Sequence, residues 1–230
     1  MELEWSENNQ PISKVFNDIY YATEDGLAES RYVYLEQNEL PKAWLEKTSF
    51  TLGELGFGTG LNFFATTKSF LESSQRDSDL YYISCEKFPL SKVDLERALK
   101  HWKEFDDLIL NFISLYEPQK QGWQKIDLCE GKIHLHLFIG DVQQFFLSFK
   151  EQMNLEIDAW YFDGFAPRKN PEMWDLSVFK EAASLTRKGG SFSSFAVAGF
   201  VRRNLEAAGF RVEKMPGFGR KREMIRGILP

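Results

Sequence analysis

From residue 49 to residue 209, short apolar runs alternate with stretches of helical periodicity. Of all features of the sequence, this alternation limits the possible folds most. The apolar runs are SFTLGELG, LYYISCE, KIHLHLFIGD, IDAWYFD and GGSFSSFA, which begin at residues 49, 80, 132, 157 and 189. Parallel strands need a crossover connection, usually a helix, so the alternation predicts a parallel sheet covered by helices. Near the C-terminus, FRVEKMP and REMIRGIL flank GFGRK and predict an antiparallel hairpin.

The length of 230 residues suits a single domain with a sizeable core, to which 21 Phe residues contribute. We expect a Rossmann-like α/β core at residues 46–230, preceded by an N-terminal extension at residues 1–45. Within the extension, SRYVYLEQ at residues 30–37 predicts a short strand. The segment at about 105–131 fits no strand–helix unit and is expected to be an inserted helical loop. A seven-stranded, mostly parallel sheet with a C-terminal antiparallel hairpin is typical of the class I methyltransferase fold.

Composition and residue spacing argue against membrane and metal-binding proteins. No apolar run approaches the roughly 18 residues of a membrane span, and the acidic start MELEWSENNQPIS lacks an export signal. We therefore expect a cytoplasmic protein with no membrane partner. Cys85 and Cys129 lack the spacing of a metal or redox motif. His134 and His136 share one face of an expected strand without a third ligand, so no metal site is predicted.

The segment ELGFGTGLN, which follows the first strand of the core, predicts a ligand-binding loop. Gly56, Gly58 and Gly60 form a GxGxG pattern, whereas the dinucleotide fingerprint GxGxxG would need a glycine at Leu61. In that fingerprint the third glycine lets the helix pack closely on the strand, with its N-terminus at a pyrophosphate. The spacing therefore favours S-adenosyl-L-methionine (SAM), which has no phosphate, although the loop alone leaves a purely structural turn open.

Acidic residues end two further expected strands. A carboxylate at Glu86 can accept hydrogen bonds from both ribose hydroxyls, and Asp141 can accept from an adenine amino group. Either residue alone is equally compatible with a helix N-cap. Ligand-like features at the ends of three successive strands favour a SAM site. The predicted cofactor-binding residues are Glu54, Gly56, Gly58, Thr59, Gly60, Asn62, Glu86, Lys87 and Asp141.

A third acid, Asp163, ends the buried run IDAWYF and is followed by GFAP. Ligands of open α/β sheets bind beyond the carboxyl ends of the strands, so Asp163 is predicted to face the reacting group. The pattern is a looser version of the motif found in amino-group methyltransferases. An alkylamine is protonated near pH 7, and a carboxylate can position it, stabilise its charge or relay its proton. Asp163 is the predicted catalytic residue, and full general-base action would need a raised pKa.

Several long strings resemble one family. They resemble the methyltransferase part of the bacterial tRNA 5-methylaminomethyl-2-thiouridine biosynthesis proteins, which are the MnmC family with its stand-alone MnmD-like methyltransferases. The strings that carry this resemblance are GFGTGLNF, ISCEKFPLS, DAWYFDGFAPRKNPEMW, AGFVRRNLEAAGF and GFGRKREMIRG. The resemblance implies SAM-dependent methylation of the 5-aminomethyl group on the wobble uridine of tRNA. Family members that are bifunctional also carry an FAD-dependent oxidoreductase module. We expect no FAD in this chain, and such a module in cis or in trans as a partner.

The charge distribution fits an RNA partner. The whole chain has a net charge of −6, yet residues 187–230 hold ten Lys or Arg and three Asp or Glu. A basic end can bind the phosphates of the anticodon loop while a base enters the pocket. Trp174 is expected in the core, and each single Arg is equally compatible with solvation of a helix. The predicted tRNA-binding residues are Phe165, Arg168, Lys169, Arg202, Arg203, Phe218, Arg220, Lys221 and Arg222.

Three other functions compete with this interpretation. A SAM-dependent or decarboxylated-SAM-dependent transferase acting on a small amine would use the same loop and acids but not the basic end. A non-catalytic RNA-binding subunit would not need intact glycine and acid positions. An NAD-dependent oxidoreductase is disfavoured by the GxGxG spacing. We also expect the N-terminal extension to cover the SAM pocket.

Overall fold

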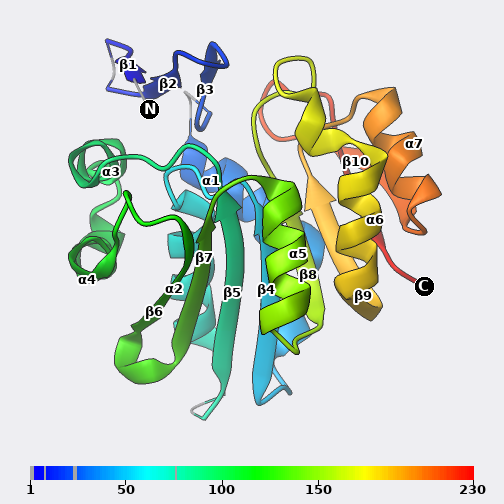
Figure 1. The fold of residues 1–230 in the computed structure, drawn as a ribbon, viewed down its shortest axis with the longest axis horizontal. Coiled ribbons are helices and arrows are strands. Elements are labelled where there is room, and N and C mark those ends of the chain that lie inside the picture. The colour runs from blue at the N-terminus through cyan, green and yellow to red at the C-terminus, as the bar shows by residue number, and fades with distance from the viewer. Residues whose placement is uncertain (1–2, 8, 23–24, 76) are drawn as a thin grey trace.

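The computed structural model describes residues 3–7, 9–22, 25–75 and 77–230. A central sheet is covered by helices on both faces, and the N-terminal strands lie beyond one end of it (Figure 1). Among the described residues this sheet has eight strands in the order β10-β11-β9-β8-β4-β5-β7-β6. They are β4 (Ser49–Leu55), β5 (Asp79–Glu86), β6 (Gly122–Leu128), β7 (Ile133–Ile139), β8 (Ile157–Phe162), β9 (Thr186–Ser194), β10 (Arg211–Pro216) and β11 (Glu223–Ile228).

The pairing of the strands confirms the expected fold class. Strands β7, β5, β4, β8 and β9 pair with one another in this order and all run parallel. The hairpin β10–β11 is antiparallel, and β11 joins it to the sheet by pairing antiparallel with β9. The helices that cover the sheet are α1 (Gly26–Ser30), α2 (Leu61–Ser73), α3 (Lys92–Leu99), α4 (Asp106–Leu115), α5 (Val142–Gln152), α6 (Leu176–Leu185) and α7 (Gly199–Ala207). A separate small sheet contains β1 (Leu3–Trp5), β2 (Pro11–Ser13) and β3 (Asp18–Ile19).

The segment expected to be an inserted helical loop differs from the prediction. It contains helix α4, as expected, but also strand β6, which pairs antiparallel with β7 and makes the sheet eight-stranded instead of seven-stranded. In β6 only Gln124, Ile126 and Leu128 are buried, and Lys125 and Asp127 between them are exposed. A half-buried edge strand of this kind has few apolar residues, so its sequence carries a weak strand signal.

The strand expected at residues 30–37 is wrong, because this segment is helical. Helix α1 begins at Gly26 with Asp25 as its N-cap, and it continues as a π-helix (Arg31–Leu35) and a 3₁₀ helix (Glu36–Asn38). Aromatic and β-branched residues such as Tyr34 favour strands locally. Packing overrides that preference here, since the Tyr34 ring lies 5.1 Å from the Tyr161 ring of β8.

Side-chain caps also start helices α3 and α6. Ser91 is the N-cap of α3, and its Oγ accepts from the Asp94 N–H at 3.1 Å. Between β8 and β9, a 3₁₀ turn (Pro171–Trp174) is followed by α6. The break is at Asp175, whose side chain accepts from the Ser177 N–H at 2.8 Å and so starts a new helix.

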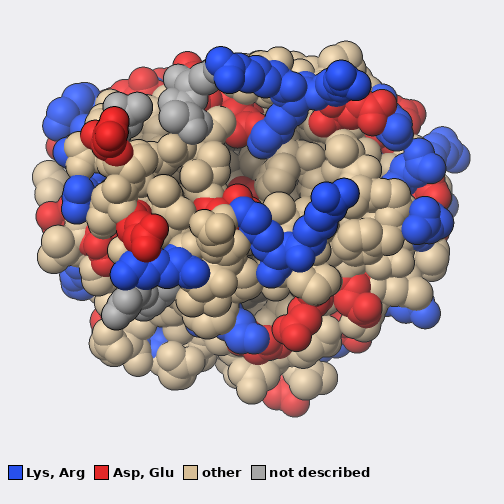
Figure 2. All heavy atoms as spheres, turned by 90° about the horizontal axis from the view of Figure 1, so that it is seen from above, with Lys and Arg blue, Asp and Glu red and all other residues tan. Residues whose placement is uncertain are grey.

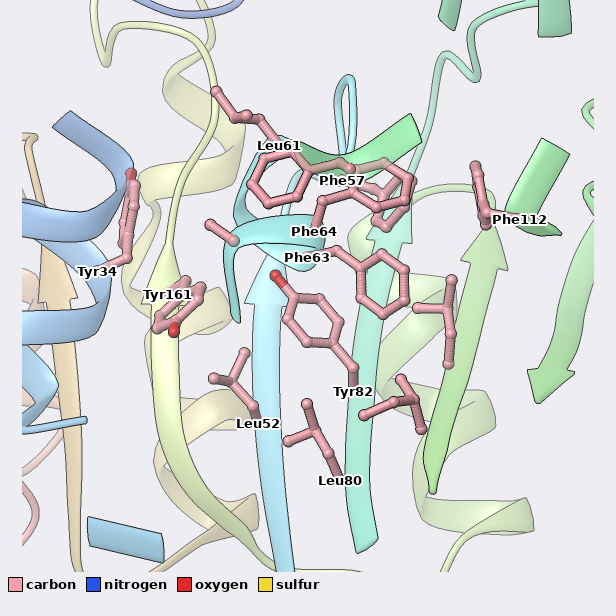
Figure 3. Close-up of a cluster of buried hydrophobic side chains, with 14 of the residues drawn as sticks. Tyr34, Leu52, Phe57, Leu61, Phe63, Phe64, Leu80, Tyr82, Phe112 and Tyr161 are labelled. Carbon is pink, nitrogen blue, oxygen red and sulfur yellow. The ribbon is translucent and has the colours of Figure 1, made fainter. Parts of the chain in front are cut away.

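The core has two halves, one on each face of the sheet. Helices α1 to α4 pack on one face and α5 to α7 on the other. Strand β8 shows the alternation, because Ala159 and Tyr161 join the first half while Trp160 and Phe162 join the second. In the first half, Phe63 and Phe64 of α2 pack over the sheet beside Tyr82 and Phe112 (Figure 3). This packing places the N-terminus of α2 at the carboxyl ends of β4 and β8.

Candidate active site

A cavity of about 770 Å³ opens at the carboxyl ends of β4, β5, β7 and β8. Figure 2 looks down on this end of the molecule, where Lys and Arg side chains surround a hollow with acidic atoms inside it. Predicted site residues that line the cavity are Gly56, Gly58, Thr59, Asn62, Glu86, Lys87, Asp141, Asp163, Phe165, Lys169, Phe218, Arg220 and Lys221. The fold therefore brings most of the predicted cofactor and substrate residues together.

Other predicted residues do not line the cavity: Glu54, Gly60, Arg168, Arg202, Arg203 and Arg222. Glu54 is fully buried beneath it. Gly60 is the N-cap of α2 with φ 77°, and a Cβ there would lie 2.9 Å from the Phe57 ring, so this glycine is needed for packing. Arg202 pairs with Glu206 on α7 at 3.6 Å. Trp174 is in the core, as expected, and its Nε1 donates to the Phe165 carbonyl at 3.1 Å.

The glycine loop passes close to the end of β8. Gly56 and Gly58 have φ angles of 93° and 55°, a region that favours glycine. A Cβ at Gly56 would lie 3.2 Å from the Asp163 carbonyl oxygen. The Gly58 N–H donates to Glu86 Oε2 at 2.8 Å, which ties the loop to the end of β5.

Two backbone groups hold the Glu86 carboxylate in place. Besides the bond from Gly58, the Phe88 N–H donates to Oε1 at 2.7 Å. Burial raises the pKa of Glu86, and these backbone N–H groups counteract the shift by stabilising the charged form. Each carboxylate oxygen has two lone pairs, so both can still accept from a ribose hydroxyl.

Asp141 caps helix α5 and also lines the cavity, where its contact with an adenine amino group stays a prediction. Its Oδ1 accepts from the Gln143 N–H at 2.9 Å at the start of α5, and Lys87 Nζ lies 2.9 Å from Oδ2. Burial opposes the charge of Asp141, but the Gln143 N–H and the Lys87 ammonium outweigh it and lower its pKa. Asp141 is therefore ionised and oriented toward the cavity wall beside Val142.

One amide links the two carboxyl groups beneath and within the cavity. Asn62 Nδ2 donates to Asp163 Oδ2 at 2.8 Å and to Glu54 Oε1 at 3.0 Å. Asn62 Oδ1 accepts from Ser30 Oγ at 2.6 Å, which joins α1 to the cluster. Ser84 Oγ donates to Glu54 Oε2 at 2.9 Å. Glu54 thus orients Asn62 from below, and Asn62 orients Asp163.

The two carboxyl groups differ in their protonation. Burial raises the pKa of Asp163 to about 6, against the opposing effect of the Gly164 N–H, the Tyr34 hydroxyl and Asn62. Burial, followed by the charge of Asp163, raises the pKa of Glu54 well above its ordinary value. Near pH 7 Asp163 is mostly ionised, and the surroundings of Glu54 favour its neutral form.

The N-terminal extension forms one wall of the cavity. Phe16 stacks on Phe165 with ring centroids 4.5 Å apart, and Tyr20 meets Phe165 edge-on at 5.1 Å. The Asp18 carboxylate accepts from the Ala166 N–H at 3.0 Å and pairs with Lys169 at 3.2 Å. The extension therefore lines part of the cavity, and that it covers bound SAM stays a prediction.

Sequence reasoning missed the cavity residues that α1 and the π-helix after it supply. They are Gly26, Glu29, Ser30, Val33 and Tyr34. Their spacing of i, i+3, i+4, i+7 and i+8 is that of one helix face, and it was the signal that could have identified them. The strand expected at residues 30–37 is incompatible with this helical spacing, so the shared face was not identified.

The site fits SAM in its chemistry. The glycine loop leaves backbone accessible, Glu86 has lone pairs for ribose hydroxyls, and Asp141 is an ionised acceptor further along the same wall. The aromatic residues Phe88 and Tyr20 also line the cavity. Among the described residues, no group of three or more His, Cys, Asp and Glu side chains is arranged to hold a metal ion. In the same part of the chain, no helix is long and apolar enough to cross a membrane.

Comparison with known proteins agrees with this chemistry. The family described as S-adenosyl-L-methionine-dependent methyltransferase matches residues 103–230. The tRNA 5-methylaminomethyl-2-thiouridine biosynthesis bifunctional protein MnmC of Idiomarina loihiensis is 42% identical over 98% of this chain and 38% of that protein. Its counterpart in Ectopseudomonas mendocina is 43% identical over 98% of this chain and 34% of that protein. The chain thus spans little more than a third of these relatives.

Solved structures support the fold. MNMC2 from Aquifex aeolicus has a TM-score of 0.75 at 24% identity, covering 99% of this chain and 70% of that one. Spermidine synthase from Thermotoga maritima has a TM-score of 0.52 at 11% identity, covering 100% of this chain and 72% of that one. At these identities the likeness establishes the class I methyltransferase fold alone.

Proposed function

The chain belongs to the S-adenosyl-L-methionine-dependent methyltransferase family, and we propose that it methylates the 5-aminomethyl group of the wobble uridine in tRNA. The reaction converts 5-aminomethyl-2-thiouridine to 5-methylaminomethyl-2-thiouridine. The observation that carries the proposal is Asp163, a carboxylate with a raised pKa at the end of β8, beside the glycine loop and within the cavity. Similarity to MnmC proteins over 98% of the chain supports the choice of substrate.

The cofactor would bind against the carboxyl ends of β4, β5 and β7. Gly56 and Gly58 leave room for its amino-acid and ribose parts, Glu86 accepts from its ribose hydroxyls, and Asp141 accepts from its adenine amino group. The bound cofactor supplies a methyl group on a positively charged sulfur. Such a methyl group reacts with a nitrogen that has a free lone pair.

Asp163 prepares the acceptor nitrogen. A primary alkylammonium has a pKa of roughly 10 and lacks a free lone pair at pH 7. The Asp163 carboxylate accepts one proton from the ammonium and becomes a carboxyl group, and the amine keeps the electron pair of the broken N–H bond. A pKa of about 6 makes Asp163 a better proton acceptor than an ordinary Asp and still leaves it ionised at pH 7. Asn62 holds Oδ2 and the Gly164 N–H holds Oδ1, so the carboxylate is oriented in advance.

The tRNA would approach the open end of the cavity. Lys169, Arg220 and Lys221 line its rim, and we propose that they meet phosphates of the anticodon loop while the uridine enters between Phe165 and Phe218. Arg168, Arg202, Arg203 and Arg222 lie outside the cavity and would contact more distant phosphates. A transferase acting on a small free amine is not favoured, given the similarity to MnmC proteins.

The relatives are named bifunctional and are much longer than this chain. We infer that an FAD-dependent oxidoreductase module, in cis or in trans, prepares the aminomethyl group, and that both steps occur in the cytoplasm, where tRNA is modified. The test is methyl transfer from labelled SAM to tRNA that carries 5-aminomethyl-2-thiouridine, followed by nucleoside analysis. Label on that nucleoside and none on tRNA with plain uridine is expected. Label on another nucleoside would refute the proposed substrate.

A further inference from the structure

A second carboxylate, Glu29 of α1, lies in the cavity apart from the glycine loop and the strand ends. Its side chain is 12% exposed, and Lys221 Nζ lies 2.6 Å from its Oε1. Lys221 comes from the turn between β10 and β11 and is 46% exposed. Its ammonium also lies 4.5 Å from the centroid of the Phe195 ring. The Lys221 ammonium therefore pairs with the nearly buried Glu29 carboxylate, although the Lys221 side chain itself is about half exposed.

The Tyr34 side chain is only 4% exposed and lines the cavity one helical turn after Ser30. Its hydroxyl interacts with the Asp163 carboxylate and opposes the rise that burial causes in the Asp163 pKa. A hydroxyl that donates to a carboxylate keeps two lone pairs, with which it can accept from a ligand. The hydroxyl approaches Asp163 closely enough for the carboxylate charge to raise the pKa of Tyr34, after burial itself.

Glu29, Tyr34 and Asp163 form one group. Burial is the main influence on Asp163 and on Tyr34, and the charge of Glu29 acts on both in the same direction. Ser30, the neighbour of Glu29 in the chain, donates to Asn62, which donates to Asp163. Two carboxylates, a hydroxyl and the face of Phe195 are the partners that an alkylammonium prefers. We call this group the ammonium site.

We propose that the substrate binds as a primary ammonium between Glu29 and Asp163 beside Tyr34, and that Lys221 occupies this site until the substrate displaces it. The inference rests on the proposed function and names the chemistry by which the acceptor is selected. The displaced Lys221 remains at the rim, where a phosphate of the incoming nucleic acid can become its new partner.

The exchange explains selectivity. When an ammonium replaces Lys221, Glu29 keeps a cationic partner. A substrate with a hydroxyl or hydrogen in place of the ammonium would leave the carboxylate unpaired in a nearly buried position, which is unfavourable. The ammonium has three N–H donors, enough for Glu29, Asp163 and Tyr34 together. One of these protons then moves to Asp163, and the neutral amine stays held by the other two groups.

The test measures binding of the nucleoside 5-aminomethyluridine, with 5-hydroxymethyluridine as its uncharged counterpart, to the full chain by calorimetry. Lys221→Met should bind the aminomethyl nucleoside about tenfold more tightly than the parent, because the competing ammonium is gone. Glu29→Gln should bind it about tenfold more weakly. For the hydroxymethyl nucleoside, Lys221→Met should show no such gain in affinity and Glu29→Gln no such loss. Lys214→Met is the matched control, since Lys214 is 45% exposed and pairs with Glu223 at 2.8 Å outside the cavity.

The rival explanation is a permanent ion pair that ties the hairpin to α1. It predicts that both variants lower the melting temperature and that Lys221→Met binds the aminomethyl nucleoside no more tightly than the parent, and that result would overturn the inference. The binding assay needs no turnover. A parent that fails to methylate modified tRNA refutes the proposed function, whereas unchanged affinity in Lys221→Met refutes the ammonium site.

Discussion

The substitution Asn62→Ala tests most sharply how the surroundings of Asp163 set its pKa, because it removes the amide that donates to this carboxylate. A hydrogen bond to a charged group contributes about 1.5–3 kcal/mol, and the bond from Asn62 to Asp163 is 2.8 Å long and partly buried. Because Asn62 stabilises the charged form of Asp163, its loss should raise the pKa of that carboxyl further. One pH unit corresponds to 1.36 kcal/mol, so the acidic limb of the activity profile should move up by about one unit or more.

The acidic limb shifts toward higher pH because the ionised form of Asp163 is the active one. In the parent, activity should fall as the pH drops through the Asp163 pKa of about 6. In Asn62→Ala the fall should begin at higher pH, with roughly tenfold less activity than the parent at pH 6 and a smaller difference at pH 9. The assay is kcat/KM for methyl transfer to modified tRNA between pH 5 and pH 9.5.

Two controls accompany this measurement. Asn111→Ala changes an exposed residue of α4 and should keep the parent profile. Calorimetric SAM affinity and the melting temperature of Asn62→Ala show whether the site still forms. A loss that is the same at every pH, or an acidic limb that stays in place, would refute the role assigned to Asn62.

Three further changes test other parts of the account. Glu86→Gln replaces one of the two carboxylate oxygens that accept from backbone N–H groups, so SAM affinity measured by calorimetry should fall about tenfold or more. Unchanged affinity would show that the ribose of SAM does not bind at Glu86. Gly53→Ala would place a Cβ 2.4 Å from a carbon of the Trp160 ring, so thermal unfolding should show a loss of about 1–3 kcal/mol. Full stability of this variant would contradict the packing. Asp175→Ala removes the cap bond to Ser177, so it should lower the midpoint of denaturant unfolding without changing SAM affinity.

The fold was largely predictable because its signals are local. Continuous apolar runs, the glycine loop and the capping residue Ser91 each act over a few neighbouring positions. The edge strand β6 was missed because it is buried on one face only and contains few apolar residues. The helical segment after Gly26 was missed because its preference for helix comes from packing of Tyr34 against Tyr161, which lies far away in the chain.

The site was predictable where a strand end determines the position of a side chain. Glu86 is the last residue of β5 and Asp163 directly follows β8, so their convergence could be expected. Glu54 lies one residue from the end of β4 and points into the core, where Asn62 and Ser84 hold it, instead of into the cavity. The helical spacing could have placed Glu29 on the same helix face as Ser30 and Tyr34. That this face lines the cavity depends on how the N-terminal extension folds back over the sheet, which the spacing does not determine.

The most direct test of the central claim compares the parent with Asp163→Asn in single-turnover methyl transfer from labelled SAM to tRNA carrying 5-aminomethyl-2-thiouridine. SAM affinity is measured on the same samples, and Asp127→Asn, an exposed change on β6, is the control. We predict label on the aminomethyl nucleoside in the parent and the control. In Asp163→Asn we expect a rate at least a hundredfold lower with SAM affinity retained. A variant that methylates at the parent rate would contradict the account, because the amine would then be prepared without this carboxylate.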